Sequence, residues 1–429
     1  MRNFISENHI FRRWYSAGSG ILAAFVFGFP ARKFCNIGVT GTDGKTTTVE
    51  MISHVLRSSK KKVLSISTSR IVLDDNILPH NKRTTPGPWQ LQRMFRKAQR
   101  NGITHVVLEV SSHALFQRRV FGIPLDVAVL TNITPEHLDY HKTLEKYAAA
   151  KHLLFSRHLR KGGTSVLNAD DSFGKIWAKE FSQKGYSILT FSEQGDRSAD
   201  YRSELFLADE KGISFTLYSP EGSSSVFIPV FGSFNVSNAL SVLCVSRALG
   251  ISEKDGIESL TSFFSVPGRM EKIESGKDFS IFIDFALTPG SLAKMLTSAR
   301  DISKDGRLSL VFGSCGSHKD IEKRRLLGKI ATKYADAVFV TDDEPYFENP
   351  EVIRKHILEG AYEESVKAIS SGKVREIPDR KKAIFQAISE ARSGDVVVVA
   401  GMGHLRSRNI AGKEISWSDE KIIREAIPA

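Results

Sequence analysis

A glycine-rich run between residues 41 and 48 has the residue types needed to bind phosphate. It reads Gly41-Thr42-Asp43-Gly44-Lys45-Thr46-Thr47-Thr48 and directly follows the apolar stretch 36–40. Glycines let the backbone approach an anion, and the N–H groups at the start of a following helix add positive potential. Lys45 would bring a charge to the terminal phosphates, and Thr46 is placed to hold Mg²⁺. The run predicts a site for ATP or a close relative.

Two later runs carry groups that could complete such a site. Glu109 ends an apolar stretch, so its carboxylate should emerge at the carboxyl edge of a parallel sheet, where open α/β sheets bind ligands. It could coordinate Mg²⁺ opposite Thr46, or it could be a polar residue that merely leaves a strand. The run 131–141 contains two histidines, two carboxylates and an asparagine, a density that favours a metal or phosphate role. For His141 a structural role is an open alternative.

The elements that would position these groups follow an α/β pattern. From residue 36 onward, short apolar runs alternate with amphipathic stretches, which predicts a largely parallel sheet buried on both faces. Residues 187–229 alternate differently and contain turn signals, which predicts an antiparallel excursion on the same domain. The expected strands are 36–40, 63–67, 105–109, 127–131 and 164–168, and the expected helices are 46–58, 89–101, 143–155 and 235–249.

A second α/β pattern begins after Val266-Pro267-Gly268-Arg269, where the Pro-Gly pair is a candidate hinge. Its expected strands are 279–285, 308–312, 337–341 and 396–400. We predict three parts in the chain. They are a basic and apolar segment at 1–35, a central ATP-binding domain with a mostly parallel sheet at 36–266, and a C-terminal Rossmann-like α/β domain at 267–429.

The composition is that of a folded enzyme. In 429 residues, apolar types make up 41% and charged types 25%, with room for two or three cores. The formal charge of +12 is scattered rather than gathered into one stripe, so anionic small substrates explain it and nucleic acid is not expected as a partner. The three cysteines, Cys35, Cys244 and Cys315, have no paired spacing, which fits a reducing cytoplasm.

The first 35 residues place an apolar run between basic residues. Arg12 and Arg13 precede the apolar segment 20–30, and Arg32 and Lys33 follow it. The segment is too short to span a bilayer and lacks a convincing cleavage site. We expect a helix packed on the first domain. Weak contact with a membrane surface and a cleaved secretory signal are the alternatives.

Taken together, these runs resemble the ATP-dependent Mur ligases, and among them the ligases acting on UDP-N-acetylmuramoyl-dipeptide. The family's phosphate loop reads G-T-x-G-K-T-T and lacks the first glycine of the general G-x-x-x-x-G-K-[ST] pattern, so Val39 at that position is expected. The resemblance covers almost everything after residue 36. The matching runs are Thr84 to Pro86, Glu109 to Leu115 with Arg119, Thr131 to His141, Tyr147 to Lys151, Phe231 to Asn238, Pro267 to Glu271, Asp284 to Pro289, Asp379-Arg380 and Gly401 to His404.

The resemblance implies ATP-dependent formation of an amide bond on a carboxylate. The γ-phosphate would activate the carboxylate as an acyl phosphate, and an amino-acid amine would displace the phosphate. Lys45 would bind the ATP phosphates, Thr46 and Glu109 would hold one Mg²⁺, and His137 with Glu109 would hold a second. Lys151, which by itself reads as a solvated helical lysine, would carry a carbamate and supply anionic oxygen to the metal.

The remaining site residues follow from the same resemblance. Asn238 would contact adenine, Arg269 the phosphates and Asp284 the ribose. The implied acceptor is a muramoyl peptide of peptidoglycan precursor synthesis, to which the enzyme would join an amino acid. The enzyme itself would be a monomer in the cytoplasm. The nucleotide loop would comprise Gly41, Thr42, Asp43, Gly44, Lys45, Thr46 and Thr47, and the acceptor contacts would come from Thr84, Thr85, Ser112, Gln117 and Arg119.

Three departures from the family pattern fall outside the ATP site. The segment 1–35 stands in place of the usual uridine-nucleotide domain, so the acceptor could be held without its uridine. Tyr346 replaces the arginine of the D-N-P-R run found in diaminopimelate-adding members, and tyrosine cannot grip a carboxylate as a guanidinium does. Leu405 replaces the glutamate of G-H-E, and Leu287 replaces the histidine of D-Y-A-H-T-P. Diaminopimelate is therefore not expected as the added amino acid.

Other functions stay open on the sequence alone. A Mur-type ligase could act on another acceptor, such as a polyglutamate or a lipid-linked wall intermediate. The altered C-terminal pocket also fits a non-catalytic ATP-binding homologue, and the phosphate loop alone fits a nucleoside triphosphatase or a kinase. Phosphate release that depends on an acceptor would separate a ligase from the others.

Overall fold

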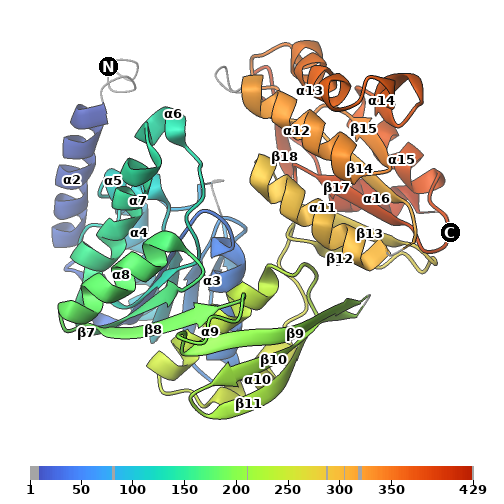
Figure 1. Cartoon of the computed structure of the whole chain (residues 1–429). Coiled ribbons are helices and arrows are strands. Elements are labelled where there is room, and N and C mark those ends of the chain that lie inside the picture. Colours follow the sequence, from blue (N-terminus) through green and yellow to red (C-terminus); the bar gives the residue numbers. More distant parts are fainter. Residues whose placement is uncertain are drawn as a thin grey trace. The chain divides into compact units, whose positions relative to one another are not determined.

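The computed structural model describes residues 9–79, 83–209, 211–286, 288–303, 305–316 and 321–427. These residues divide into two compact units (Figure 1). The first unit comprises residues 1–207, 214–228 and 234–264, and the second comprises residues 208–213, 229–233 and 265–429. Strands alternate with helices through most of the chain, so the predicted α/β class is confirmed.

Eleven strands, whose described residues lie mostly in the first unit, form one sheet. The strands are β1 (Cys35–Thr40), β2 (Val63–Ile66), β3 (Ile71–Leu73), β4 (Asn76–Leu78), β5 (His105–Glu109), β6 (Leu125–Leu130), β7 (Leu159–Asn168), β8 (Ser187–Ser192), β9 (Tyr201–Asp209), β10 (Gly212–Ser219) and β11 (Gly222–Ile228). Their order is β11-β10-β9-β8-β7-β6-β1-β5-β2-β3-β4. β1 pairs in parallel with β5 on one side and β6 on the other. The carboxyl end of β1 is therefore a switch point of the kind that binds ligands in open α/β sheets.

Helices connect these strands, and some of them begin at polar capping residues. Thr143 accepts a hydrogen bond from the N–H of Lys146 where α7 begins, and Asp171 accepts from the N–H groups of Phe173 and Gly174 where α8 begins. The helices of this unit are α2 (His9–Val26), η1 (Pro30–Lys33), α3 (Lys45–Ser58), α4 (Pro88–Arg100), α5 (Ser112–Phe116), α6 (Leu138–His141), α7 (Leu144–Leu153), the π-helical turn η2 (Leu154–His158), α8 (Ser172–Gln183), α9 (Asn235–Ala248) and α10 (Glu253–Thr261).

Two expectations for this unit need correction or refinement. The predicted antiparallel excursion is wrong at its start, because β8 pairs in parallel with β7 and β9 pairs in parallel with β8. The physical reason is α8, a crossover helix that returns the chain so that β8 enters the sheet in the same direction as β7. The predicted helix 143–155 is α-helical only to Leu153 and continues as η2.

The N-terminal apolar segment forms a helix in this unit. α2 ends at Val26 and packs beside α4, which confirms the expected helix on the first domain. In the part of the chain that the structure describes, no helix combines the length and the apolar character needed to traverse a bilayer.

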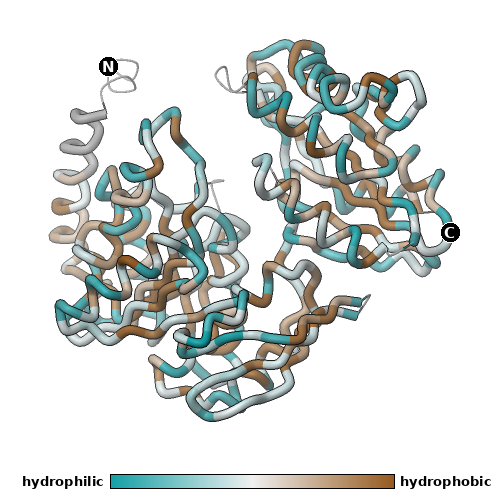
Figure 2. The backbone as a smooth tube through the Cα atoms, in the orientation of Figure 1, coloured by the Kyte–Doolittle hydropathy of each residue, from teal (hydrophilic) through white to brown (hydrophobic). Residues whose placement is uncertain are grey.

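The described residues of the second unit form a six-stranded sheet and a separate hairpin. The strands are β12 (Glu271–Ile273), β13 (Ser280–Asp284), β14 (Leu308–Phe312), β15 (Ala337–Val340), β16 (Val374–Glu376), β17 (Val396–Ala400), β18 (Ser407–Ile410) and β19 (Lys413–Ser416). The sheet order is β12-β13-β17-β14-β15-β16, parallel except for β12. The helices are α11 (Pro289–Ser303), α12 (Ile321–Tyr334), α13 (Pro350–Glu364), α14 (Lys367–Ser370), α15 (Arg380–Ser389) and α16 (Asp419–Ala426). Figure 2 shows hydrophobic residues concentrated along the strands, where Phe339, Val397 and Val399 are fully buried.

Candidate functional site

The phosphate-binding loop leaves the carboxyl end of β1 and turns into α3. Its two glycines have positive φ angles, 150° at Gly41 and 81° at Gly44, which favour glycine over other residues. Space is also restricted, because a side chain at Gly41 would lie 1.8 Å from the hydroxyl of Thr131. At Gly44 it would lie 2.3 Å from the amide oxygen of Asn238. The Lys45 ammonium folds back to donate to the carbonyl oxygen of Thr42 at 2.6 Å.

The loop is held by the residues that follow β6. The amide oxygen of Asn132 accepts from the N–H of Asp43 at 2.9 Å, and the hydroxyl of Thr131 donates to the carbonyl oxygen of Asp43 at 2.6 Å. The hydroxyl of Thr42 accepts from the N–H of Thr134 at 3.0 Å. Thr131, Asn132 and Thr134, at the start of the run 131–141, thus fix the conformation of the loop. The sequence alone shows this run only as a dense polar stretch.

Glu109 lies at the end of β5 with its carboxylate buried beside α3. Its exposed fraction is 1%, and one carboxylate oxygen accepts from the hydroxyl of Thr46 at 3.0 Å and from the N–H of Thr68 at 2.6 Å. The other oxygen accepts from the hydroxyl of Thr68 at 2.9 Å. Thr68 is not among the site residues predicted from the sequence. Its position directly after β2, at the same sheet edge as Glu109, is the feature that could have indicated it.

Lys151 is buried rather than solvated. Its exposed fraction is 1%, its ammonium donates to the carbonyl oxygen of Gly41 at 2.5 Å, and it lies 4.3 Å from the centre of the Tyr147 ring. Burial, and then the charge of Lys45, hold the pKa of Lys151 well below its usual value. The alternative of an ordinary surface lysine is therefore excluded.

Aromatic rings gather around His113, close to the loop. The His113 ring centre is 4.8 Å from that of His137 and 4.2 Å from that of Tyr140. Burial, followed by the neighbouring His137 and His141, lowers the pKa of His113 to about 3, so this imidazole is neutral at physiological pH. His141 is buried, and its ring lies 3.1 Å from the hydroxyl of Ser112. This packing fits the structural role left open for His141.

The five residues predicted to contact the acceptor lie around the same sheet edge. The hydroxyl of Thr85 donates to the carbonyl oxygen of Glu109 at 2.9 Å, and Thr84 accepts from the hydroxyl of Thr68 at 3.0 Å. The Arg119 guanidinium donates to the amide oxygen of Gln117 at 2.7 and 3.0 Å and to the carbonyl oxygen of Thr85 at 3.3 Å. Ser112 begins α5 next to this group. The structure therefore brings these side chains together with Glu109.

The residues that would hold Mg²⁺ fit a hard cation through oxygen donors. Among the described residues, no three His, Cys, Asp or Glu side chains are grouped as metal ligands. A magnesium ion here would instead use the Glu109 carboxylate and the Thr46 hydroxyl, which already lie 3.0 Å apart. Oxygen donors are what Mg²⁺ prefers, and a carbamate on Lys151 would add two more.

Arg269 and Asp284 belong to the second unit. One carboxylate oxygen of Asp284 accepts from the N–H of Met270 at 2.8 Å, and the Arg269 guanidinium lies 5.1 Å from the centre of the Phe285 ring. Asn238 belongs to the first unit, where its amide oxygen accepts from the hydroxyl of Thr48 at 3.3 Å.

Two acidic residues, Asp343 and Glu344, precede Tyr346, which is one of the positions that depart from the family pattern. Burial raises the pKa of Asp343 to about 6, and its backbone oxygen accepts from Arg408 at 2.6 and 3.0 Å. The hydroxyl of Tyr346 donates to the carboxylate of Glu344 at 3.4 Å. Leu287 lies outside the described residues. Arg408 is a further residue that the sequence did not single out, because a lone arginine on a short strand has no distinguishing pattern.

Arg380 has a structural role in this unit. Both its exposed fraction and that of its partner Asp419 are near zero, and the two side chains form a two-pronged ion pair at 2.7 and 2.9 Å. The same guanidinium donates to the carbonyl oxygen of Ala400 at the end of β17. The Asp379-Arg380 run therefore fixes α15 to α16 and to the sheet edge.

Gly268 offers a direct test of close packing in the second unit. Its φ is +68°, and a side chain there would lie 2.3 Å from the backbone nitrogen of His404. Gly276 has nearly the same φ of +66° with open space around it. We expect Gly276→Ala to lower the free energy of unfolding by about 1 kcal/mol through left-handed strain. Gly268→Ala should lower the free energy of unfolding by a further ~1–3 kcal/mol, because backbone atoms must move apart to admit the new side chain. Equal losses in urea unfolding of the two variants would contradict the packing argument.

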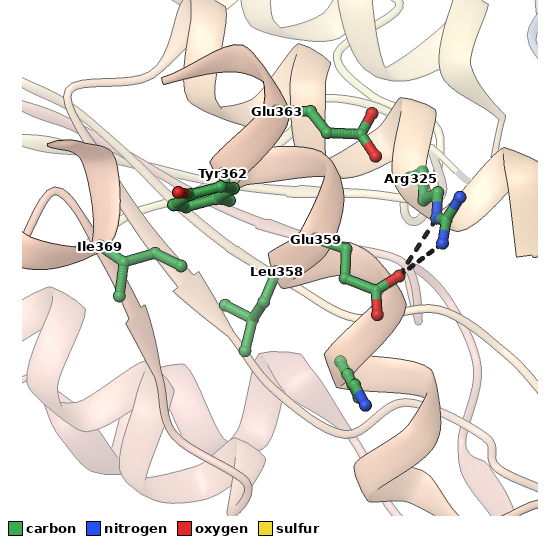
Figure 3. Close-up of a pocket in the computed structure, with 7 residues that line it drawn as sticks. Arg325, Leu358, Glu359, Tyr362, Glu363 and Ile369 are labelled. Atoms are coloured by element: carbon green, nitrogen blue, oxygen red, sulfur yellow. Dashed lines mark hydrogen bonds and ion pairs between the residues drawn. The ribbon is translucent and has the colours of Figure 1, made fainter. Parts of the chain in front are cut away.

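The second unit has a surface pocket. It is formed by α12, α13 and α14, and an ion pair between Arg325 and Glu359 at 2.8 and 3.1 Å crosses one side of it (Figure 3). None of the residues predicted for catalysis or binding lines it. The lining residues are Arg325, Lys355, Leu358, Glu359, Tyr362, Glu363 and Ile369.

Two family models match the sequence. The model described as Mur ligase middle domain matches residues 39–246. The model described as Mur ligase, glutamate ligase domain matches residues 268–403. Together they cover most of both units.

Relatives that match over most of the chain carry one recurring name. The sequence is 37% identical over 415 residues to the UDP-N-acetylmuramoyl-L-alanyl-D-glutamate–2,6-diaminopimelate ligase of Bacillus licheniformis, which covers 95% of this chain and 81% of that relative. It is 35% identical over 412 residues to the ligase of the same name from Streptomyces coelicolor, covering 96% of this chain and 79% of that relative.

Solved structures agree with these relatives. A UDP-N-acetylmuramoyl-L-alanyl-D-glutamate–2,6-diaminopimelate ligase matches with a TM-score of 0.66 and 32% identity, over 92% of this chain and 78% of that one. Folylpolyglutamate synthase of Mycobacterium tuberculosis, solved with ADP and AMPPCP, matches with a TM-score of 0.69 over 88% of this chain and 91% of that one. At 17% identity, the second match shows a shared fold alone.

Proposed function

This chain belongs to the Mur ligase family and is an ATP-dependent ligase, and we propose that it joins an amino acid to the carboxylate of a muramoyl-peptide acceptor in peptidoglycan precursor synthesis. One observation supports the proposal most strongly. The buried Glu109 carboxylate contacts Thr46 of the phosphate loop, while its backbone oxygen contacts Thr85 on the acceptor side. A phosphoryl donor and a carboxylate acceptor would therefore meet at one sheet edge.

The reaction would proceed in two steps. First, an acceptor carboxylate oxygen attacks the γ-phosphorus of ATP, the bond to the bridging oxygen breaks, and ADP leaves with an acyl phosphate formed. Then the amine attacks the acyl carbon, the carbon–oxygen bond breaks, inorganic phosphate leaves, and the amine loses a proton. Lys45 and the N–H groups of the loop would offset the charge on the phosphates. Arg119 and Thr85 would orient the acceptor.

Magnesium and a carbamate complete the proposal. Bound Mg²⁺ supplies charge stabilisation at the transferring phosphate. Thr46, Glu109, His137 and a carbamylated Lys151 would hold it. Carbamate formation needs an unprotonated amine, and the buried position of Lys151 beside Lys45 disfavours its charged form.

The amino acid added would differ from that named for the relatives. A diaminopimelate carboxylate would need a cationic partner, and Tyr346 offers a hydroxyl that already contacts Glu344. The proposed acceptor is therefore the muramoyl peptide, and the proposed amino acid is one other than diaminopimelate. The proposed setting is the cytoplasm, where ATP is available, and the proposed state is a monomer.

The proposal is tested with the full chain, ATP, Mg²⁺ and UDP-N-acetylmuramoyl-alanyl-glutamate. Each amino acid, including lysine and diaminopimelate, is added singly, and phosphate release is measured together with product mass. We expect phosphate release that requires both acceptor and amino acid, with a mass gain of one residue. Phosphate release independent of every acceptor would overturn the muramoyl-peptide assignment.

A further inference from the structure

Helix α2 packs on the first unit through small residues. Ala17, Ala23 and Ala24 are buried, and a side chain at Gly20 would lie 3.1 Å from Cβ of Phe121. On the other side of the contact, a side chain at Gly122 would lie 3.0 Å from Cβ of Ala24. Small residues at the contact allow a close approach, and the large side chains between residues 21 and 26 lie on the other face of the helix.

That other face is apolar and lies in solvent. A helix on a soluble protein normally shows the reverse arrangement, with its large apolar residues inward. Clustered apolar side chains in solvent mark a contact surface. In Figure 2 the end of α2 near η1 carries hydrophobic colours. The residues are Ile21, Leu22, Phe25 and Val26, which are 49%, 54%, 73% and 58% exposed, and we call them the α2 apolar face.

The two segments that contain α2 and α4 have basic residues and no acidic ones. Residues 9–34 contain four Lys or Arg and no Asp or Glu, and residues 76–108 contain six Lys or Arg and no Asp or Glu. Arg32 and Lys33 are exposed just after α2, and Arg93, Arg96 and Lys97 are exposed on α4, which packs beside α2. An apolar helix face flanked by basic side chains is suited to bind a bilayer with anionic headgroups, because the apolar residues enter the acyl chains and the basic residues contact the headgroups.

An interfacial tryptophan joins the two helices of this surface. Trp89, at the start of α4, is 41% exposed, and its ring meets that of Phe27 edge-on with centres 6.2 Å apart. Tryptophan is enriched at membrane–water interfaces because its ring is apolar and its N–H is polar. The position of Trp89 therefore continues the α2 apolar face onto α4.

We propose that α2 and the start of α4 form a peripheral membrane-binding surface for anionic lipid bilayers. The α2 apolar face enters the acyl-chain boundary, and the basic residues of α4 and of the segment after α2 contact lipid phosphates. The proposal is independent of the ligase reaction, because no residue of this surface belongs to the site around Glu109.

Vesicle flotation of the full chain tests this surface. Vesicles of equal parts phosphatidylglycerol and phosphatidylcholine should carry the protein upward, with the bound fraction falling as salt is raised. The variant L22S/F25S should bind about tenfold more weakly or worse. The matched control I176S removes an equally exposed side chain, 61% exposed on α8, and should bind as the unmodified chain does.

Charge is tested separately from apolar burial. R93Q/R96Q should weaken binding to the anionic vesicles by roughly thirtyfold, because each of the two basic residues contributes ~1 kcal/mol near the surface and about 1.4 kcal/mol is a factor of ten. It should not change binding to pure phosphatidylcholine. Circular dichroism and ligase turnover check that each variant is folded, and both should match the unmodified chain.

Three outcomes would overturn the proposal. One is absence of vesicle binding by the unmodified chain at low salt. Another is equal binding by L22S/F25S and I176S. The third is concentration-dependent dimerisation in sedimentation that L22S/F25S abolishes while vesicle binding is nil, since a second copy would then cover the α2 apolar face.

Discussion

Alanine in place of Lys151 is expected to lower kcat about a thousandfold while the protein stays folded. A carbamylated lysine would help hold a cation that supplies several kcal/mol of charge stabilisation at the transferring phosphate. With about 1.4 kcal/mol for each factor of ten in rate, a loss of ~4 kcal/mol gives this magnitude. Steady-state phosphate release with acceptor and amino acid present measures the effect.

The same helix supplies the control for Lys151→Ala. Lys146 lies five residues earlier on α7 with its side chain exposed, so Lys146→Ala should keep normal turnover. Short carboxylic acids should partly restore the Lys151→Ala variant, because they can occupy the place of the missing carbamate. In the unmodified chain, ¹³C-bicarbonate should give a carbamate signal that the variant lacks. Full activity in Lys151→Ala would refute the carbamate.

Glutamine at position 109 is expected to lower kcat by about two orders of magnitude or more. The change keeps the shape of the side chain but removes the negative charge that would hold Mg²⁺, a contribution worth several kcal/mol. The Mg²⁺ concentration needed for half-maximal turnover should also rise. Stability should fall by only about 1–3 kcal/mol, since the new amide N–H₂ would face donors of Thr68 or Thr46.

Glu50 provides a matched carboxylate for this experiment. It is 2% exposed on α3 and is held by the Arg70 guanidinium at 2.8 and 3.0 Å. Glu50→Gln should therefore reduce stability without shifting the Mg²⁺ dependence. If both variants changed that dependence equally, the effect would come from altered packing of the loop, and the metal role of Glu109 would be contradicted.

Much of the fold could be predicted because the buried strands are continuous apolar runs. The predicted strands 105–109, 308–312 and 396–400 coincide with β5, β14 and β17. Such runs are bounded by polar or glycine residues, so their ends are visible in the sequence. The direction of β8 was not visible, because strand direction depends on α8 as a crossover and not on the strand's own pattern.

The site was predictable where a residue type is distinctive and its position follows a strand. Glu109 and the glycine-rich loop are of this kind. Thr68 was missed because a threonine between serines has no distinctive chemistry until the fold brings it 2.6 Å from Glu109. The burial of Lys151 was equally invisible locally, since it results from contact with Gly41, 110 residues earlier in the chain. Roles for these residues stay predictions that the variants above address.

The packing of α2 also bears on how the protein should be shortened for biophysical work. Deleting residues before 30 would remove the α2 apolar face, which is attractive for solubility. It would also uncover Phe121 and Gly122, against which the small residues of the helix pack. Exchanging Leu22 and Phe25 for polar residues in the intact chain should lower the apolar exposure and leave that contact in place. For solubility, substituting the exposed apolar residues of α2 is therefore preferable to deleting the helix.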